Sequence, residues 1–163
     1  MNIHFTVADY YHPVHQRAIL MLMEGYTRDP MGGGKPLSRY SKNHLIAGLQ
    51  KYPTAVTVLA FSGEEPVGLV TCFESLSTFA AKPLLNIHDV TVQPQFRGQG
   101  VATTLLSEVE KIARARGCCK LTLEVLSGNE MARKVYRKNG FGNYQLDPAM
   151  GHAEFWEKDL LSG

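Results

Sequence analysis

The sequence predicts an α/β fold of the α+β kind, in which helices pack on a mixed, mostly antiparallel central sheet. Segments whose apolar residues alternate with period two are interspersed with segments whose apolar residues recur every 3.6 positions. A length of 163 residues with 44% hydrophobic residues suffices for one core and is short for two. We therefore expect a single domain over residues 1–163, with about seven strands and about four helices.

The first half of the chain predicts a strand, two helices and a three-stranded meander. The expected elements are a strand over 3–7, a helix from Pro13 to about residues 25–27, a helix capped by Ser38, and strands over 55–61, 66–73 and 85–92. The glycine-rich stretch from Arg28 to Pro36 separates the two helices as a loop.

The second half alternates helices and strands. The expected elements are a helix from Val101 that Gly117 ends, a strand over 118–126, a helix that Asn129 caps and Gly140 ends, and strands over 141–146 and 153–160.

Composition excludes several classes of partner. The net charge of +2 and the lack of a basic run interleaved with aromatics argue against nucleic acid as the main partner. The apolar run 18–23 is far shorter than a membrane span, and no charged leader precedes an apolar core at residues 1–5. Three cysteines without C-x-x-C spacing predict reduced thiols, a cytoplasmic protein and no metal site.

The most informative segment runs from Val92 to Thr103, where an apolar strand breaks into a glycine turn and then an amphipathic helix. A helix start leaves N–H groups unpaired and carries partial positive charge. Gly98 and Gly100 keep side chains out of the way, so a phosphate could reach these donors.

Two other phosphate motifs do not fit. The stretch 32–35 is Gly-Gly-Gly-Lys, but a P-loop needs glycine where Asp29 stands and serine or threonine where Pro36 stands. A dinucleotide fingerprint needs a small residue where Thr103 stands, and it opens an alternating βαβ unit rather than following a meander.

Three features together resemble the GNAT superfamily of N-acetyltransferases. They are the strand ending in Val90-Thr91-Val92-Gln93-Pro94, the Arg97-x-x-Gly100-x-Ala102 turn with its apolar helix, and the segment from Asn129 to Tyr136-x-x-x-Gly140-Phe141. The specific part runs from about residue 86 to 141, and the first half matches only in outline.

The resemblance implies that acetyl-CoA is the donor. Its pyrophosphate would meet the backbone of Gly98, Gln99, Gly100, Val101, Ala102 and Thr103. Its pantetheine arm would pair with Val90, Thr91 and Val92 where the sheet splays between strands four and five. Arg97 heads the turn in either a binding or a structural role, and Asn129 is expected to cap its helix and to contact the cofactor.

The chemistry needs a base and an acid. An amine with a pKa near 10 is mostly protonated at pH 7, so removing its proton costs about 4 kcal/mol. Asp89 and Glu124 are the two candidate bases, and Glu124 is slightly favoured. The resemblance also implies a bulge in the fourth strand, which leaves the faces of both carboxylates open. Tyr136 matches the family's tyrosine that protonates the departing thiolate.

The sequence therefore predicts an enzyme that moves an acetyl group to a primary amine of a small molecule or peptide. The alternative is a non-catalytic acyl-CoA sensor or interaction module. The loops over 28–36 and 76–83 are expected to border the acceptor, whose identity the sequence leaves open. A homodimer is also left open, since family members are often dimers.

Overall fold

The structure, a computed structural model, describes residues 2–161. These form two compact units divided after Leu126. The first contains β1 (Ile3–Val7), α1 (Pro13–Arg28), the 3₁₀ turn η1 (Pro30–Gly32), α2 (Arg39–Lys51), β2 (Ala55–Ser62), β3 (Glu65–Ser77), β4 (Lys82–Val92), the 3₁₀ turn η2 (Pro94–Phe96), α3 (Val101–Ala115) and β5 (Leu121–Leu123). The second contains α4 (Glu130–Lys138) and the 3₁₀ turn η3 (Pro148–Met150).

The first unit is built on one sheet with the strand order β1-β2-β3-β4-β5. The first four strands pair antiparallel, and β5 pairs parallel to β4, which confirms a mixed, mostly antiparallel sheet. The β4–β5 pairing joins only Leu85–Ile87 to Leu121–Leu123. Beyond Ile87, the outer edge of β4 therefore has no strand partner within residues 2–161.

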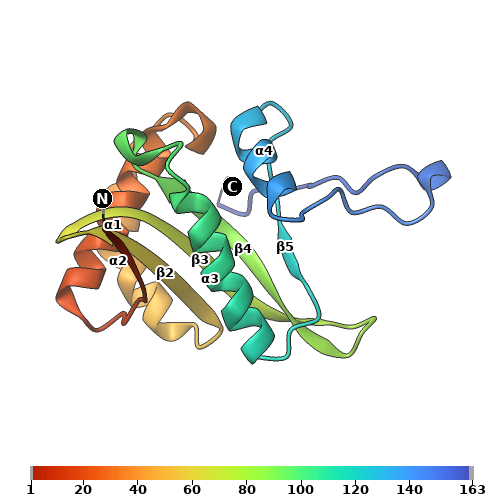
Figure 1. Cartoon of the computed structure of the whole chain (residues 1–163), viewed down its shortest axis with the longest axis horizontal. Coiled ribbons are helices and arrows are strands. Elements are labelled where there is room, and N and C mark those ends of the chain that lie inside the picture. Colours follow the sequence, from red (N-terminus) through yellow and green to blue (C-terminus); the bar gives the residue numbers. More distant parts are fainter. Residues whose placement is uncertain (1, 162–163) are drawn as a thin grey trace. The chain divides into compact units, whose positions relative to one another are not determined.

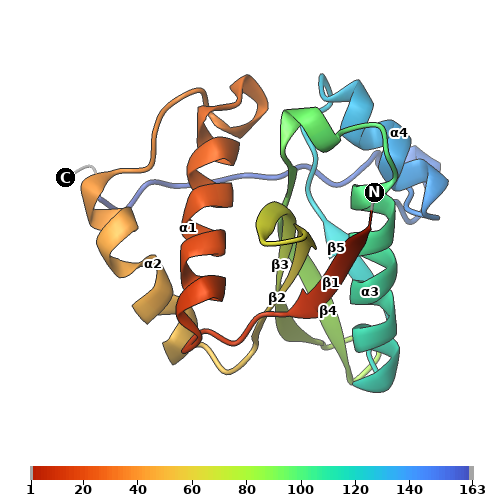
Figure 2. The ribbon, with the colours of Figure 1, turned by 60° about the vertical axis from the view of Figure 1, so that its left-hand side comes forward.

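Helices cover both faces of this sheet, α1 and α2 on one side and α3 on the other (Figures 1 and 2). Ile19 of α1 packs with Leu59 and Leu69 of the sheet in one buried cluster. On the opposite face, Leu105 and Val109 of α3 are fully buried. Their burial fixes α3, and with it the turn that leads into α3.

The start of each of two helices matches its predicted cap. The Ser38 hydroxyl accepts a hydrogen bond from the Ser41 amide at 3.0 Å, and the Asn129 side-chain oxygen accepts one from the Ala132 amide at 3.1 Å. The number of α-helices, four among the described residues, also agrees with the prediction. None of these helices has the length and apolarity that crossing a membrane requires.

The prediction of about seven strands is wrong, because the residues that the structure describes form a sheet of five. The segments 141–146 and 153–160 contain no strand, although the Ala153 amide donates to the Tyr144 carbonyl at 3.4 Å. The strand expected over 118–126 is limited to Leu121–Leu123. Alternating residues favour an extended chain, but a strand also needs a partner along its length.

We predict that Leu59→Ala lowers the free energy of unfolding by about 2–5 kcal/mol, because Leu59 is fully buried and its loss leaves a cavity. Leu76→Ala is the matched control, since Leu76 lies on β3 with 63% of its surface exposed. Urea unfolding monitored by circular dichroism measures both. Equal losses in the two variants would contradict the core described above.

Candidate functional site

The junction between β4 and α3 is a turn bent by two glycines. Gly98 and Gly100 have φ values of +76° and +83°, in the left-handed region that other residues rarely adopt. Nothing lies within 4 Å of where a Cβ would stand at either position. Gly100 is the N-cap of α3 and offers no side-chain hydrogen bond. The cap of α3 thus offers its first N–H groups no side-chain acceptor, and the turn beside them faces open space at both glycines.

Apolar anchors on both sides hold this turn in place. Phe96 and Val101 are 6% and 3% exposed, whereas residues 97–100 between them are exposed. The Gln93 amide also donates to the Val67 carbonyl of β3 at 2.8 Å. The backbone that would meet a ligand is therefore fixed by its neighbours and accessible itself.

The Arg97 side chain makes two structural contacts. Its Nε donates to the Val92 carbonyl at 3.0 Å, and its Nη2 contacts Asp29 Oδ2 at 2.9 Å. The first contact holds the end of β4, and the second reaches the loop after α1. Hydrogen bonds from Arg97 and from the Met31 amide lower the pKa of Asp29, and the Met31 contribution is the larger.

The fourth strand carries the bulge that the family resemblance implied. Thr71 of β3 pairs with Asp89, but the next residue, Cys72, pairs with Ile87, so His88 is an extra residue on β4. His88 is exposed and packs edge-on against Phe73. The bulge resets the alternation, and this resolves the face of Asp89 that the sequence left open.

Asp89 lies on the face of the sheet that α1 covers. Its partner Thr71 is buried and shares a 3.0 Å hydrogen bond with Thr57, which lies two residues from Leu59 of the α1 cluster. Burial raises the pKa of Asp89, opposed in part by the charge of His88. Burial, together with the charges of Asp89 and Asp29, also raises the pKa of Tyr26. The raised pKa makes the Asp89 carboxyl better suited to accept a proton than an ordinary surface aspartate.

The other predicted site residues occupy different surroundings. Glu124 lies one residue beyond β5 and is exposed. Asn129 and Tyr136 belong to the second unit, where Asn129 caps the start of α4 and Tyr136 lies within α4. The Tyr136 ring is half-buried and meets Phe141 edge-on at 6.0 Å between centroids. The first unit thus brings together Asp89, residues 90–92 and the turn.

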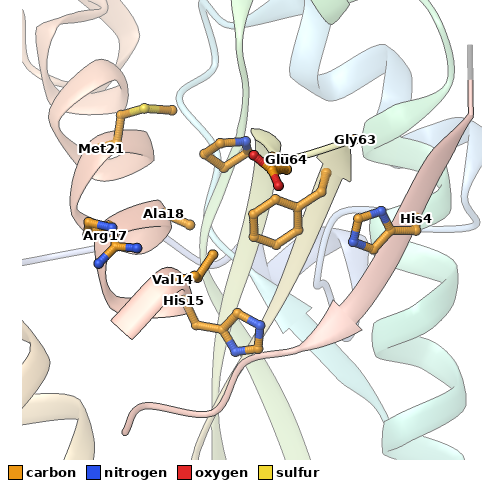
Figure 3. Close-up of a pocket in the computed structure, with 10 residues that line it drawn as sticks. His4, Val14, His15, Arg17, Ala18, Met21, Gly63 and Glu64 are labelled. Atoms are coloured by element: carbon orange, nitrogen blue, oxygen red, sulfur yellow. The ribbon is translucent and has the colours of Figure 1, made fainter. Parts of the chain in front are cut away.

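A separate hollow of roughly 600 Å³ lies between α1 and the β1–β2 edge of the sheet (Figure 3). It is lined by His4, Val14, His15, Arg17, Ala18, Met21, Phe61, Gly63, Glu64 and Pro66, none of them a predicted site residue. His15 Nδ1 accepts the Asp9 amide hydrogen at 3.0 Å, so its neutral ring keeps a proton on Nε2 and has no free lone pair for a base. His15 therefore does not supply a base to this hollow.

Sequence analysis missed the roles of Tyr26 and Asp29. Asp29 precedes Pro30, the pattern of a helix N-cap, and its Oδ1 does accept the Met31 amide hydrogen at 2.9 Å. Its pairing with Arg97, 68 positions away, leaves no local signal. Among residues 2–161, no group of three or more His, Cys, Asp or Glu side chains is placed to hold a metal ion.

Comparison with protein families gives a match to the model described as the acetyltransferase (GNAT) family, over residues 20–141. The chain is 36% identical over 100 residues to a thialysine N-epsilon-acetyltransferase of Caenorhabditis elegans, which covers 56% of this chain and 62% of that protein. It is 37% identical over 78 residues to a streptothricin acetyltransferase of Streptomyces lavendulae, covering 48% and 41%. The matches thus span less than two thirds of these relatives.

Among solved structures, the fold is similar to an aminoglycoside acetyltransferase from an uncultured soil metagenomic sample. The TM-score is 0.76 at 15% identity, with 96% of this chain and 97% of the other covered. At this identity the likeness concerns the fold alone.

We predict that Gly100→Ala destabilises the protein by about 1–2 kcal/mol, because alanine is strained at a φ of +83°. Gly25→Ala is the matched control. Gly25 lies in α1 with nothing within 4 Å of a new Cβ, so alanine there should stabilise by up to about 1 kcal/mol. Thermal unfolding of the two variants distinguishes them, and a neutral Gly100→Ala would argue against the left-handed turn.

Proposed function

Because the chain belongs to the acetyltransferase (GNAT) family, we propose that it transfers the acetyl group of acetyl-CoA to a primary amine by direct attack in a ternary complex. The observation that carries this proposal is the left-handed turn at Gly98 and Gly100, which leaves bare amides at the start of α3. Acetyl-CoA supplies an activated thioester, and the chain's residues bind, orient and move protons.

The turn fits a pyrophosphate by its chemistry. Backbone N–H groups of residues 98–103 donate, and the helix start adds partial positive charge. The edge of β4 at Val90–Val92 has no strand partner within residues 2–161, and the backbone groups that Arg97 does not contact can meet an extended amide-bearing arm, as an added strand would. Arg97 holds the end of this edge through the Val92 carbonyl.

Asp89 is the base that the structure supports better. Its raised pKa brings it closer to the working pH, so it accepts a proton from an ammonium group at lower cost than a surface carboxylate. Glu124 is exposed and remains the second candidate. Tyr136 is the proposed acid, because a phenol with a pKa near 10 donates a hydrogen without being ionised at neutral pH.

The acceptor we propose is a primary amine on a small molecule. The relatives' names refer to thialysine and to streptothricin, and a fold neighbour's to an aminoglycoside. A peptide amine is tested alongside them. A homodimer stays a proposal that sedimentation can address.

We predict that the protein releases free CoA thiol from acetyl-CoA with at least one amine of a panel containing lysine analogues, polyamines, aminoglycosides and a peptide with a free amine. Acetyl-CoA should also raise the melting temperature, as ligand linkage requires. Stabilisation without turnover on any amine would favour a non-catalytic acyl-CoA sensor. The absence of both effects would refute acetyl-CoA as a ligand.

Among the candidate catalytic groups, we predict that Asp89→Asn lowers kcat by about 10²–10⁴-fold, the usual value of a positioned base. Glu124→Gln should change it by less than about threefold, and Tyr136→Phe should lower it by at least about tenfold. Glu110→Gln, at an exposed position of α3, is the control for removing a carboxylate. A larger loss in Glu124→Gln than in Asp89→Asn would reassign the base.

Asp89 also makes a prediction about stability. Because its folded-state pKa lies above the unfolded value, ionisation costs stability as the pH rises between the two values. Asp89→Asn removes that cost, so its melting temperature should exceed that of the wild type at pH 7 and converge with it as the pH falls below the unfolded pKa near 4. Melting curves across this range check the sign, and a variant less stable at pH 7 would oppose it.

A further inference from the structure

An ion pair joins the loop between α1 and α2 to the turn at residues 97–100, which we call the cofactor turn because the proposed function places acetyl-CoA there. Asp29 Oδ2 lies 2.9 Å from Arg97 Nη2, and Figures 1 and 2 show η1 beside the turn that precedes α3. The Asp29 side chain is 23% exposed and that of Arg97 41% exposed. Arg97 cannot move without disturbing the Val92 carbonyl, which its Nε holds at 3.0 Å.

Asp29 also organises its own loop. Its Oδ1 accepts the Met31 amide hydrogen, and its backbone carbonyl accepts those of Gly32 at 2.8 Å and Gly34 at 3.0 Å. Three residues of the loop thus bond to one aspartate. A movement of Asp29 relative to Arg97 would carry this whole turn of chain with it.

The loop is pressed against the end of α1 that faces the proposed base. A Cβ at Gly32 would lie 2.0 Å from the Tyr26 carbonyl oxygen, so the loop backbone touches Tyr26 directly. The Lys35 amide donates to the Thr27 carbonyl at 2.9 Å, and the Leu37 amide to Glu24 Oε2 at 3.1 Å. Burial and, after it, the charge of Asp89 raise the pKa of Tyr26. The loop therefore connects the surroundings of Asp89 to the turn.

We propose that the Asp29–Arg97 pair is a clasp by which occupation of the cofactor turn orders the loop over residues 29–37 for the amine acceptor, with Asp29 as a positioning residue. This inference rests on the proposed function. An anion at the turn restrains residues 97–100, Arg97 passes that restraint to Asp29, and Asp29 passes it to the amides of residues 31, 32 and 34. The ligand class that the turn would sense is a diphosphate-bearing cofactor.

Asp29→Asn is the informative variant. Asparagine is as good a cap as aspartate, so its side-chain oxygen can keep the Met31 contact while the charge opposite Arg97 is lost. Asp29→Glu keeps the charge and tests rescue. The control is Glu110→Gln, which removes an exposed ion pair with Arg114 on α3, away from the loop.

The first measurement is hydrogen exchange of the amides of residues 31–35 with and without CoA. We expect CoA to slow their exchange at least threefold in the wild type and in Glu110→Gln, and less than 1.5-fold in Asp29→Asn. CoA should still bind Asp29→Asn within about threefold of its wild-type Kd. Equal protection in Asp29→Asn and the wild type would overturn the clasp.

The second measurement separates KM from kcat with the best amine of the panel. Asp29→Asn should raise the amine KM at least fivefold with a change in the acetyl-CoA KM of less than twofold, and Asp29→Glu should recover part of the loss. A rise confined to the acetyl-CoA KM would instead make Arg97 a direct phosphate ligand and refute the clasp. If the wild type binds no CoA, the proposed function itself fails, which the first measurement reveals before any variant is compared.

Discussion

The architecture of this protein depends on how α3 is fixed against the sheet. Leu105 and Val109 are fully buried, and the Leu105 side chain would lie 3.2 Å from a Cβ at Gly68 of β3, so helix and strand approach closely. Because packing against the sheet holds α3 in place, the helix does not depend on a capping side chain at its N-terminus. The turn at Gly98 and Gly100 can therefore leave the first amides of α3 without a side-chain acceptor.

On the opposite face of the sheet, hydroxyl groups are buried beneath α1 and bond to one another. The Tyr10 hydroxyl bonds to Thr57 Oγ1 at 3.0 Å, and Thr57 Oγ1 bonds to Thr71 Oγ1 at the same distance. A buried hydroxyl without a partner costs about 1–3 kcal/mol, so the three must stay in register. Asp89 stands at the end of this row on β4, as the partner of Thr71. The row thus links β2 to β3, and Thr71 of β3 is the register partner of the proposed base.

The sequence was sufficient for features that depend on neighbours along the chain. The turn from Val92 to Thr103, the caps at Ser38 and Asn129, and the order of the first strands are local patterns, and the structure contains them. The bulge at His88 was implied only by family resemblance, since alternation alone gives no sign of one extra residue. The face of Asp89 could not be assigned until that residue was located.

Features that depend on distant partners could not be predicted. The segments 141–146 and 153–160 alternate like strands but form no ladder, and β5 stops at Leu123. Pairing is a property of two segments, and the pattern of one does not show whether the other is present. The same limit applies to Asp29, whose nearest sequence neighbours explain its cap but not its pairing with Arg97.

The ion pair between Asp29 and Arg97 differs from the other surface ion pairs of the first unit in how its partners are held. Pairs such as Arg114 with Glu110 and Lys111 with Glu108 join neighbours on one helix, are well exposed and contribute about 0.5 kcal/mol or less. Arg97 is held at a second point by the Val92 carbonyl, so less side-chain freedom remains to be lost when it meets Asp29. An ion pair between two elements, with one partner already fixed, does more to define geometry than to add stability. That is the property a loop beside a ligand-binding turn requires.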